Sequence, residues 1–499
     1  MAGWSFPLEL DVTADEPLFL QITRSIADEI RRGRLRPGAR LPGTRTLAQT
    51  LSVHRNTVVS AYDELLSEGW IEASEARGTF VSTALPDVAP PPMARRLSGR
   101  EGVPGHPGFD LRPGPDRADL AKAPPGALVM SIGVPDVRLL PTAALARSYR
   151  RALRGEPLSV LGYSDPEGHP RLRAALAVML SAARGLAIGP EEIVVTQGSQ
   201  MALDLVARTI LEPGDAVAVE AFGYSPAWEA LRSRGARLVP VPVDEAGLDV
   251  EALRAVSKRV RLRAVYLTPH HQYPTMVTLA AGRRLALLDL ARQERMAVIE
   301  DDYDHDFHYE GRPVLPLASA DRAGVVVYVG SLAKILAPGL RLGFVAGPRA
   351  LVERVATHRS FLDRQGNQAI ECAVAELLED GEVQRHARRA RRVYRRRRDF
   401  LMAVLRRRFG DALSFRAPSG GMALWVKVAG ADVDAFAARA LDLGVLFHPG
   451  RRYAFDGKRR PFVRLAFASL SEPELAEAVR RLGRAFDDCR RRSCRGAGT

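Results

Sequence analysis

Apolar residues recur every three or four positions in the first seventy residues of the chain, a periodicity that predicts helices with one buried face. One such run extends from Leu18 to Ile30. Two more helices are predicted at 44–51, with its first residue as the N-cap, and at about 54–68. Residues 70–82 hold two strand-like segments around a turn, which predicts a β-hairpin. The head of the chain should therefore contain three helices and a hairpin.

The apolar periodicity stops near residue 84. Residues 84–127 are rich in proline, glycine and charge and offer little material for a core. Such a composition is typical of an extended tether. We therefore predict an N-terminal domain of residues 1–83 and a second domain that begins at 128.

From residue 128 short apolar runs alternate with amphipathic helices, the pattern of a doubly wound, mostly parallel α/β sheet. Polar or glycine-rich residues follow the carboxyl end of each run, and ligands of open α/β sheets bind at that edge. The sequence therefore predicts a ligand site there. The runs predicted as strands are 193–196, 216–220, 265–268, 297–301 and 325–329.

The last part of the chain indicates a smaller α+β domain, from about 359 to 488, and a basic tail at 489–499. Residues 388–398 carry a dense run of arginines, but an apolar stripe from Ala390 to Leu405 passes through it. We interpret the run as the solvated face of a core helix rather than as a second nucleic-acid site.

Composition narrows the class of protein further. A hydrophobic content of 46% and a charged content of 26% are typical of a globular protein. The net charge of +14 indicates an anionic partner, with nucleic acid first and phosphate metabolites second. Three cysteines are too few for a disulfide framework or a zinc site. No secretory signal or membrane-spanning run is evident, so we expect a soluble cytoplasmic protein.

Lys334 is one of only five lysines in a chain whose positive charge comes almost entirely from arginine. A lysine can lose its proton and attack a carbonyl, whereas an arginine stays charged. Ser331 lies three positions before it and Arg341 seven positions after it. Together they suit an aldehyde cofactor with a phosphate: the amine for the aldehyde, the hydroxyl and guanidinium for the phosphate.

The acidic residues around Asp301 raise an alternative, which is metal binding. Clustered carboxylates hold Mg²⁺ in phosphohydrolases. That alternative leaves the lysine and its neighbours without a role. His270, His271 and His305 lack a convincing metal-ligand pattern. We therefore predict no metal site.

Three helices and a hairpin of this size describe a winged helix-turn-helix, and this head resembles the GntR family. The matching segments are Leu41-Pro-Gly-Thr-Arg-Thr-Leu-Ala48, His54-Arg-Asn-Thr-Val58 and Leu65-Leu-Ser-Glu-Gly-Trp-Ile71. Gly43 and His54 stand where that family usually has serine. The resemblance implies operator DNA as a partner. The implied DNA contacts are Arg45, Arg55, Asn56, Thr57, Arg77 and Gly78.

From about Val129 to Asp488 the chain resembles a fold-type I, class I aminotransferase, and with its GntR-like head it resembles the MocR-type regulators. Two unrelated motif sets thus occur in the order of that family. The resemblance implies pyridoxal 5'-phosphate as the cofactor, with Lys334 as the lysine of the internal aldimine. Asp301 would bond the pyridine nitrogen, and its spacing from the lysine is that of the family.

The resemblance also assigns the other ligand contacts. Tyr303 would reach the ring hydroxyl of the cofactor, and Tyr224 would stack on its ring. Arg464 would pair with a carboxylate of the ligand. The phosphate would be held by Gly198 and Ser199 at a helix start, by Ser331 and Arg341, and by Tyr163 from the other subunit of a homodimer.

Four residues depart from the family pattern. Ala333 precedes the lysine where serine is usual, Phe222 replaces a proline, and Met276 replaces the glycine of a Pro-Thr-Gly turn. Tyr273 takes the place of the asparagine that aminotransferases have near the ring hydroxyl. None of these changes removes the aldimine chemistry, but they bear on the substrate side of the site.

These resemblances imply a transcriptional regulator that depends on pyridoxal phosphate. We expect a homodimer that senses a small amine or amino acid, or the cofactor itself, through Lys334, with at most a half-transamination. Two other interpretations stay open at this point. One is a working aminotransferase with an accessory DNA-binding head, and the other is a DNA-binding protein whose large domain only dimerises.

Overall fold

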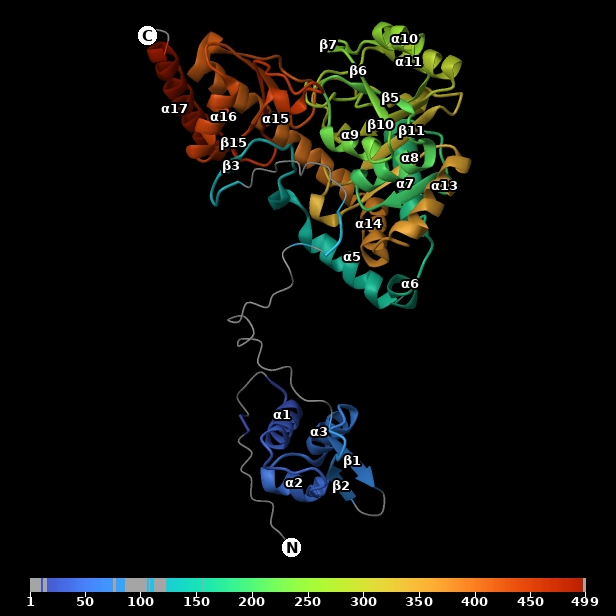
Figure 1. Cartoon of the computed structure of the whole chain (residues 1–499), viewed down its shortest axis with the longest axis vertical. Coiled ribbons are helices and arrows are strands. Elements are labelled where there is room, and N and C mark those ends of the chain that lie inside the picture. Colours follow the sequence, from blue (N-terminus) through green and yellow to red (C-terminus); the bar gives the residue numbers. More distant parts are fainter. Residues whose placement is uncertain are drawn as a thin grey trace. The chain divides into compact units, whose positions relative to one another are not determined.

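The computed structural model describes residues 10–11, 16–74, 78–85, 106, 108–111, 123–155 and 157–496, with side chains as far as 491. The chain divides into two compact units, Met1–Ala118 and Asp119–Thr499 (Figure 1). Arg77 of the predicted DNA contacts lies outside the described residues.

The N-terminal unit contains the expected three helices and hairpin. The buried positions of the third helix are Val58, Ala61, Tyr62 and Leu65, as its periodicity predicts. The second helix has Gly43 as its N-cap with no side-chain bond, so the prediction that its first residue caps it was wrong. The elements are α1 (Leu18–Arg31), α2 (Thr44–Leu51), α3 (Arg55–Ser67), β1 (Ile71–Ser74) and β2 (Gly78–Val81).

The second unit is built on a seven-stranded sheet with the order β4-β12-β11-β10-β9-β5-β6. All five predicted strands are present. The sequence missed β12, which is short and runs antiparallel to both neighbours, and β6, an edge strand interrupted by a proline. The strands are β4 (Ile193–Thr196), β5 (Ala216–Glu220), β6 (Arg237–Val241), β9 (Leu262–Leu267), β10 (Ala297–Asp302), β11 (Val326–Ser331) and β12 (Gly343–Ala346).

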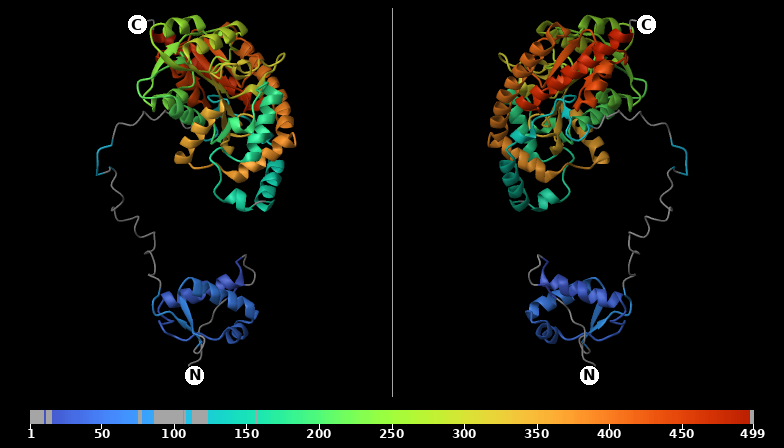
Figure 2. Two further views of the ribbon diagram at one scale, coloured as in Figure 1. Left: turned by 90° about the vertical axis from the view of Figure 1, so that its right-hand side faces the viewer. Right: turned by 90° about the vertical axis from the view of Figure 1, so that its left-hand side faces the viewer.

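Helices cover both faces of this sheet (Figure 2). Three of them, α8, α9 and α13, share one apolar cluster with the sheet, and α7, α10, α11 and α14 contribute to the clusters on the opposite face. The helices are α5 (Thr142–Gly155), α6 (Pro157–Leu161), α7 (Pro170–Arg184), α8 (Ser199–Ile210), α9 (Ser225–Arg232), α10 (Val250–Ser257), α11 (Ala281–Glu294), α12 (Leu317–Ala320), α13 (Arg349–Leu362) and α14 (Gln368–Glu379). A small hairpin joins β7 (Val243–Asp244) to β8 (Gly247–Leu248).

The smaller domain packs three helices on a four-stranded antiparallel sheet. Its sheet has the order β13 (Leu413–Ser414), β14 (Ala423–Val428), β17 (Phe462–Ala466) and β16 (His448–Pro449). Its helices are α15 (Glu382–Phe409), α16 (Val433–Asp442) and α17 (Glu472–Gly496). A parallel pair joins β3 (Leu128–Val129) to β15 (Val445–Leu446).

The arginine run of α15 is the outer face of a core helix, as predicted, because Ala390, Tyr394 and Leu405 are buried on the other face. Two of its arginines are buried as well: Arg397 and Arg398 donate to backbone carbonyls. The tail predicted from residue 489 begins inside α17, which continues to Gly496. In the described part of the chain, no helix is both long and apolar enough to cross a membrane.

Candidate functional site

Lys334 lies just beyond the carboxyl end of β11, at the edge of the sheet where the sequence places the ligand. Burial and the neighbouring Arg464 lower the pKa of its amine from 10.5 to about 8, although Asp304 and Asp301 act in the opposite direction. A lowered pKa increases the fraction of neutral amine, which is the form that attacks a carbonyl. The fold therefore gives Lys334 the environment that a nucleophilic amine needs.

Asp301 is buried near the end of β10, and only one of its two carboxylate oxygens has a hydrogen-bond partner among the described residues. Its Oδ2 accepts a hydrogen bond from the Tyr266 hydroxyl at 2.8 Å, whereas its buried Oδ1 has no partner among the described residues. Burial raises the pKa of this carboxyl to about 7. A protonated ring nitrogen that donates to Oδ1 would satisfy the free oxygen and stabilise the ionised carboxylate.

Tyr266, which the sequence did not identify, positions this carboxylate from the neighbouring strand β9. Its only signal in the sequence is a hydroxyl-bearing ring within an apolar strand.

Four of the five expected phosphate contacts, all but Tyr163, lie near the start of α8. Gly198 is the N-cap of this helix with a φ of +83°, and Ser199 is its first residue. The guanidinium of Arg341 lies over the turn, since a Cβ at position 198 would come within 3.3 Å of it. Ser331 ends β11 opposite Gly343, where a Cβ would press on the same turn. Helix-start amides, a hydroxyl and a guanidinium are thus within one small region, which suits a phosphate.

Arg464 is only 1% exposed and comes from β17 of the smaller domain. Its Nη1 donates to the carbonyl of Ser131 at 3.5 Å, and its buried Nε has no partner among the described residues. No carboxylate in the described part of the chain lies within ion-pair distance of it. Burying an unpaired guanidinium is costly, and a ligand carboxylate would pair with it bidentately.

Aromatic rings surround the guanidinium of Arg464, which lies 4.7 Å from the ring centre of Tyr273. The Tyr273 ring in turn makes edge-to-face contacts with Tyr224, Tyr303 and Tyr453 at centroid distances of 5.5, 6.2 and 5.6 Å. Tyr273, one of the four departures, therefore lies at the centre of the ligand side. Tyr453 comes from the smaller domain and carries no signal in the sequence.

The hydroxyl of Tyr303 donates to the carbonyl of His271 at 2.9 Å. Its oxygen can still accept a hydrogen bond, so a contact with the cofactor ring hydroxyl stays a prediction. Met276, another departure, is buried at a φ of +63°, a left-handed conformation that costs a non-glycine residue about 1–2 kcal/mol. The glycine usual at this position would not carry that cost.

Tyr163 lies apart from this group on the outer surface, where it is 83% exposed. The guanidinium of Arg364 lies over its ring, at 4.3 Å from the ring centre. Three further large apolar side chains are strongly exposed. Leu158 and Leu161 lie in α6, just before Tyr163 in the chain, and Phe361 lies in α13.

The expected DNA contacts form an exposed group on the head. Arg45 lies in α2, while Arg55, Asn56 and Thr57 occupy the first turn of α3. All but the half-buried Thr57 are exposed. His54 caps α3, because its Nδ1 accepts from the N–H of Asn56 at 3.2 Å, so the departure from serine preserves the cap.

The wing strand β2 begins at Gly78, whose φ is +102°. The exposed Arg40 lies against it, with its Nε 3.4 Å from the place of a Cβ at position 78. The sequence did not identify Arg40 as a candidate contact, because only its pairing with Phe80 brings it to the wing.

Comparisons with known proteins match both units. Residues 18–81 match the family described as bacterial regulatory proteins, gntR family, and residues 126–482 match aminotransferase class I and II. The chain is 34% identical over 480 residues to the probable rhizopine catabolism regulatory protein MocR of Rhizobium meliloti, covering 96% of each chain. It is 33% identical to the HTH-type transcriptional regulator TauR of Rhodobacter capsulatus, covering 93% of this chain and 96% of that protein.

Among solved structures, the larger unit is similar to LysN, the alpha-aminoadipate aminotransferase of Thermus thermophilus, in complex with N-(5'-phosphopyridoxyl)-L-leucine. The TM-score is 0.69 at 33% sequence identity, over 73% of this chain and 93% of that one. The similarity concerns the fold of the aminotransferase-like part of the chain. The GntR-family match, residues 18–81, lies in the N-terminal unit.

Proposed function

We propose that this chain, which belongs to the class I and II aminotransferases and carries a GntR-family head as the MocR-type regulators do, is a DNA-binding transcriptional regulator. It senses an amine through pyridoxal phosphate. The supporting observation is the union of two sites in one chain. Exposed cations lie on the helix-turn-helix, and the larger unit holds a lysine of lowered pKa together with a buried carboxylate that has a free oxygen. A regulator of this kind acts in the cytoplasm.

The residues present fit pyridoxal phosphate. When bound, this cofactor supplies an aldehyde that an amine can hold covalently and a ring that withdraws electrons. Lys334 provides the amine, with burial and Arg464 favouring its neutral form. Asp301 provides the free Oδ1 as acceptor for the ring nitrogen. The start of α8 and Arg341 provide amides and a charge for the phosphate.

The effector that this site favours is a small amino acid. Arg464 would hold its carboxylate, and the effector's amine would then lie where it competes with the amine of Lys334 for the same aldehyde. The effector would contact both domains of the larger unit, since Arg464 belongs to the smaller domain and Lys334 to the larger one. Effector binding of this kind, coupled to DNA binding, is allosteric regulation.

We also infer a homodimer through the aminotransferase-like domains. Leu158 in α6 and Phe361 in α13 are 92% and 86% exposed, and so is most of Tyr163, whose ring contacts Arg364 just after α13. Large apolar side chains exposed together mark interaction surfaces. In a dimer, Tyr163 would be free to reach the phosphate of the other subunit, and two heads would bind two half-sites with added avidity.

Replacing Arg55 by Ala should weaken operator binding by about 1–3 kcal/mol in each subunit if the side chain reads a base edge. If it contacts a phosphate instead, the affinity should fall by the same factor for all DNA sequences. The slope of log affinity against log salt concentration should then become shallower by about one. The measurement is fluorescence anisotropy with duplexes that the protein itself selects from a random pool, at several salt concentrations.

Arg354→Ala is the matched control, since Arg354 is exposed in the other unit. Equal affinities for the parent and Arg55→Ala, or a parent affinity that does not change with salt, would contradict the DNA-binding assignment.

Asp301→Asn should weaken cofactor binding by about 1.5–3 kcal/mol, roughly 10- to 150-fold, because it removes a charged hydrogen-bond acceptor. It should also change the pH dependence of the cofactor-free protein. Folding raises the pKa of Asp301 from 3.8 to about 7, so the folded chain keeps a proton that the unfolded chain loses between these values. The parent's free energy of unfolding should therefore fall as the pH rises through this window.

The Asp301→Asn variant should lose the contribution of this carboxyl to the slope of the free energy of unfolding against pH. Glu220 and Glu300 also have raised pKa values, of about 8 and 7, but they contribute to parent and variant alike. Urea denaturation at pH values from about 4.5 to 7.5 measures the difference, with the exposed Asp289→Asn as control. Identical slopes for parent and Asp301→Asn would show that this carboxyl is not the buried group described above.

A further inference from the structure

Four of the ten histidines of the chain are packed together next to the ligand site. His270, His271 and His305 are at most 4% exposed, and His308 is 9% exposed. The ring centre of His270 lies 4.3 Å from that of His271 and 4.4 Å from that of His305. Buried imidazoles need partners for their nitrogens, because an unsatisfied buried polar group is costly.

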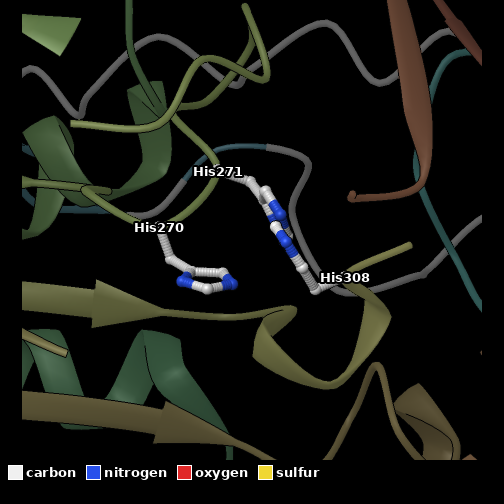
Figure 3. Close-up of side chains that lie close together, drawn as sticks. All are labelled: His270, His271 and His308. Carbon is white, nitrogen blue, oxygen red and sulfur yellow. The ribbon is translucent and has the colours of Figure 1, made fainter. Parts of the chain in front are cut away.

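Three of these residues turn nitrogens toward one another. One nitrogen each from His270, His271 and His308 lies within 4.8 Å of the other two. Figure 3 shows His271 and His308 pointing toward each other, with His270 beside them. Both ring nitrogens of His270, Nε2 of His271 and Nδ1 of His308 are buried without a hydrogen-bond partner among the described residues. We propose that these three histidines bind a divalent transition-metal ion of the kind that prefers imidazole, such as Zn²⁺.

Asp304 prepares His271 for this role. Its Oδ1 lies 2.7 Å from Nδ1 of His271, and both side chains are fully buried. Because a carboxylate only accepts, Nδ1 carries the proton and Nε2 presents its lone pair to the ligand. A carboxylate behind a histidine is the usual outer-sphere arrangement of zinc sites. His305 has a carboxylate of its own, since its Nδ1 lies 3.3 Å from Asp302, and it packs against His270.

Gly420 lies against the side of His271 that carries the free nitrogen. A Cβ at this position would clash with Nε2 of His271, and the backbone of Gly420 forms a β-bridge with His308. Zinc–nitrogen bonds of about 2.0–2.1 Å place the nitrogens of a tetrahedral site about 3.3 Å apart, so small rotations of the rings would complete it. The fourth position would be left to water or another small ligand.

The proposed ion would stabilise the loop that carries Tyr273 of the ligand site. His271 belongs to the same loop as Tyr273, and its carbonyl accepts the hydrogen bond of Tyr303. His308 follows β10, and its partner Gly420 precedes β14 of the smaller domain. The ion would therefore join the loop after β9 to the segment after β10, next to the bridge with the smaller domain. No motif in the sequence indicates this site, because His308 is distant from the other two ligands along the chain.

Calorimetric titration of the chelator-treated holoprotein with Zn²⁺ tests the proposal. The expected result is one ion per chain, together with a higher melting temperature and a zinc absorption edge fitted by imidazole nitrogens. His308→Gln and His270→Gln should each weaken binding by more than the roughly 10- to 100-fold that is typical of losing an outer-sphere partner. His386→Gln changes another buried histidine, on α15, and should bind as the parent does.

A parent that binds no stoichiometric Zn²⁺ would overturn the proposal whether or not the variants fold. So would folded variants at both positions that bind as tightly as the parent. If His386→Gln lost binding to the same extent, the effect would belong to general destabilisation and not to this site, and the proposal would fail in that case too.

Discussion

Lys334→Ala should leave the purified protein without covalently held pyridoxal phosphate. No arginine can replace the amine, and the chain has only four other lysines. We therefore expect complete loss of the visible absorbance that survives desalting, and of the cofactor label that borohydride fixes to the chain. The parent should show both. The measurement is an absorbance spectrum before and after borohydride, followed by mass spectrometry of the labelled peptide.

Lys427→Ala is the matched control, since Lys427 is exposed on β14. It should behave as the parent does. The phosphate contacts at the start of α8 do not depend on Lys334, so the variant should still bind added cofactor reversibly. A variant that retained a borohydride-fixed cofactor would show that another group forms the covalent link.

Arg464→Gln should remove the preference for ligands that carry a carboxylate. Truncating one partner of a buried charge pair costs about 2–5 kcal/mol, so the affinity for an amino acid should fall roughly 30- to 4,000-fold. The corresponding amine without a carboxylate should bind the parent and the variant about equally. Titration of the visible absorbance with matched pairs of amino acid and amine measures both affinities.

The surface variant Arg416→Gln serves as the control for loss of an arginine, because Arg416 is largely exposed. Since Arg464 lowers the pKa of Lys334, Arg464→Gln should also move the pKa of that amine above its value of about 8 in the cofactor-free protein. Equal losses of affinity for amine and amino acid would mean that Arg464 supports the fold of the site and does not read the carboxylate.

The working aminotransferase remains the rival that kinetics can separate from a sensor. A sensor needs at most one half-reaction, whereas an enzyme turns over an amino donor and a keto acid continuously. The aromatic group around Tyr273, where aminotransferases have asparagine, favours the sensor. Sustained turnover that Lys334→Ala abolishes, without any effect on DNA binding, would favour the enzyme instead.

Much of the fold was predictable because its signals are local. The periodicity of α3 and the β-branched runs at the centre of the sheet each lie within one segment, and so does the run that leads to Lys334. What the sequence missed depends on pairing between distant segments. Tyr266 reaches Asp301 only through the register of β9 with β10, and Arg40 reaches the wing only through its bridge to Phe80.

Tyr453 and His308 show the same limit, because only folding brings each of them to its site. Tyr453 reaches the ring of Tyr273 from the smaller domain, and His308 reaches His270 and His271 from the segment after β10. The resemblance to the aminotransferases implied both the cofactor and the pairing of Arg464 with a ligand carboxylate. The structure adds that Arg464 is buried and that its Nε has no partner among the described residues.

Sensing through Lys334 is tested by the operator affinity of the holoprotein with and without an amine effector, measured on self-selected duplexes for the parent and for Lys334→Ala. The effector is first identified as the amino acid that changes the visible absorbance of the parent. This ligand should change the operator affinity of the parent by roughly 5- to 150-fold, a coupling of about 1–3 kcal/mol, and should leave that of the variant unchanged. A parent whose DNA affinity ignores the ligand, or a variant that responds as the parent does, would contradict sensing through Lys334.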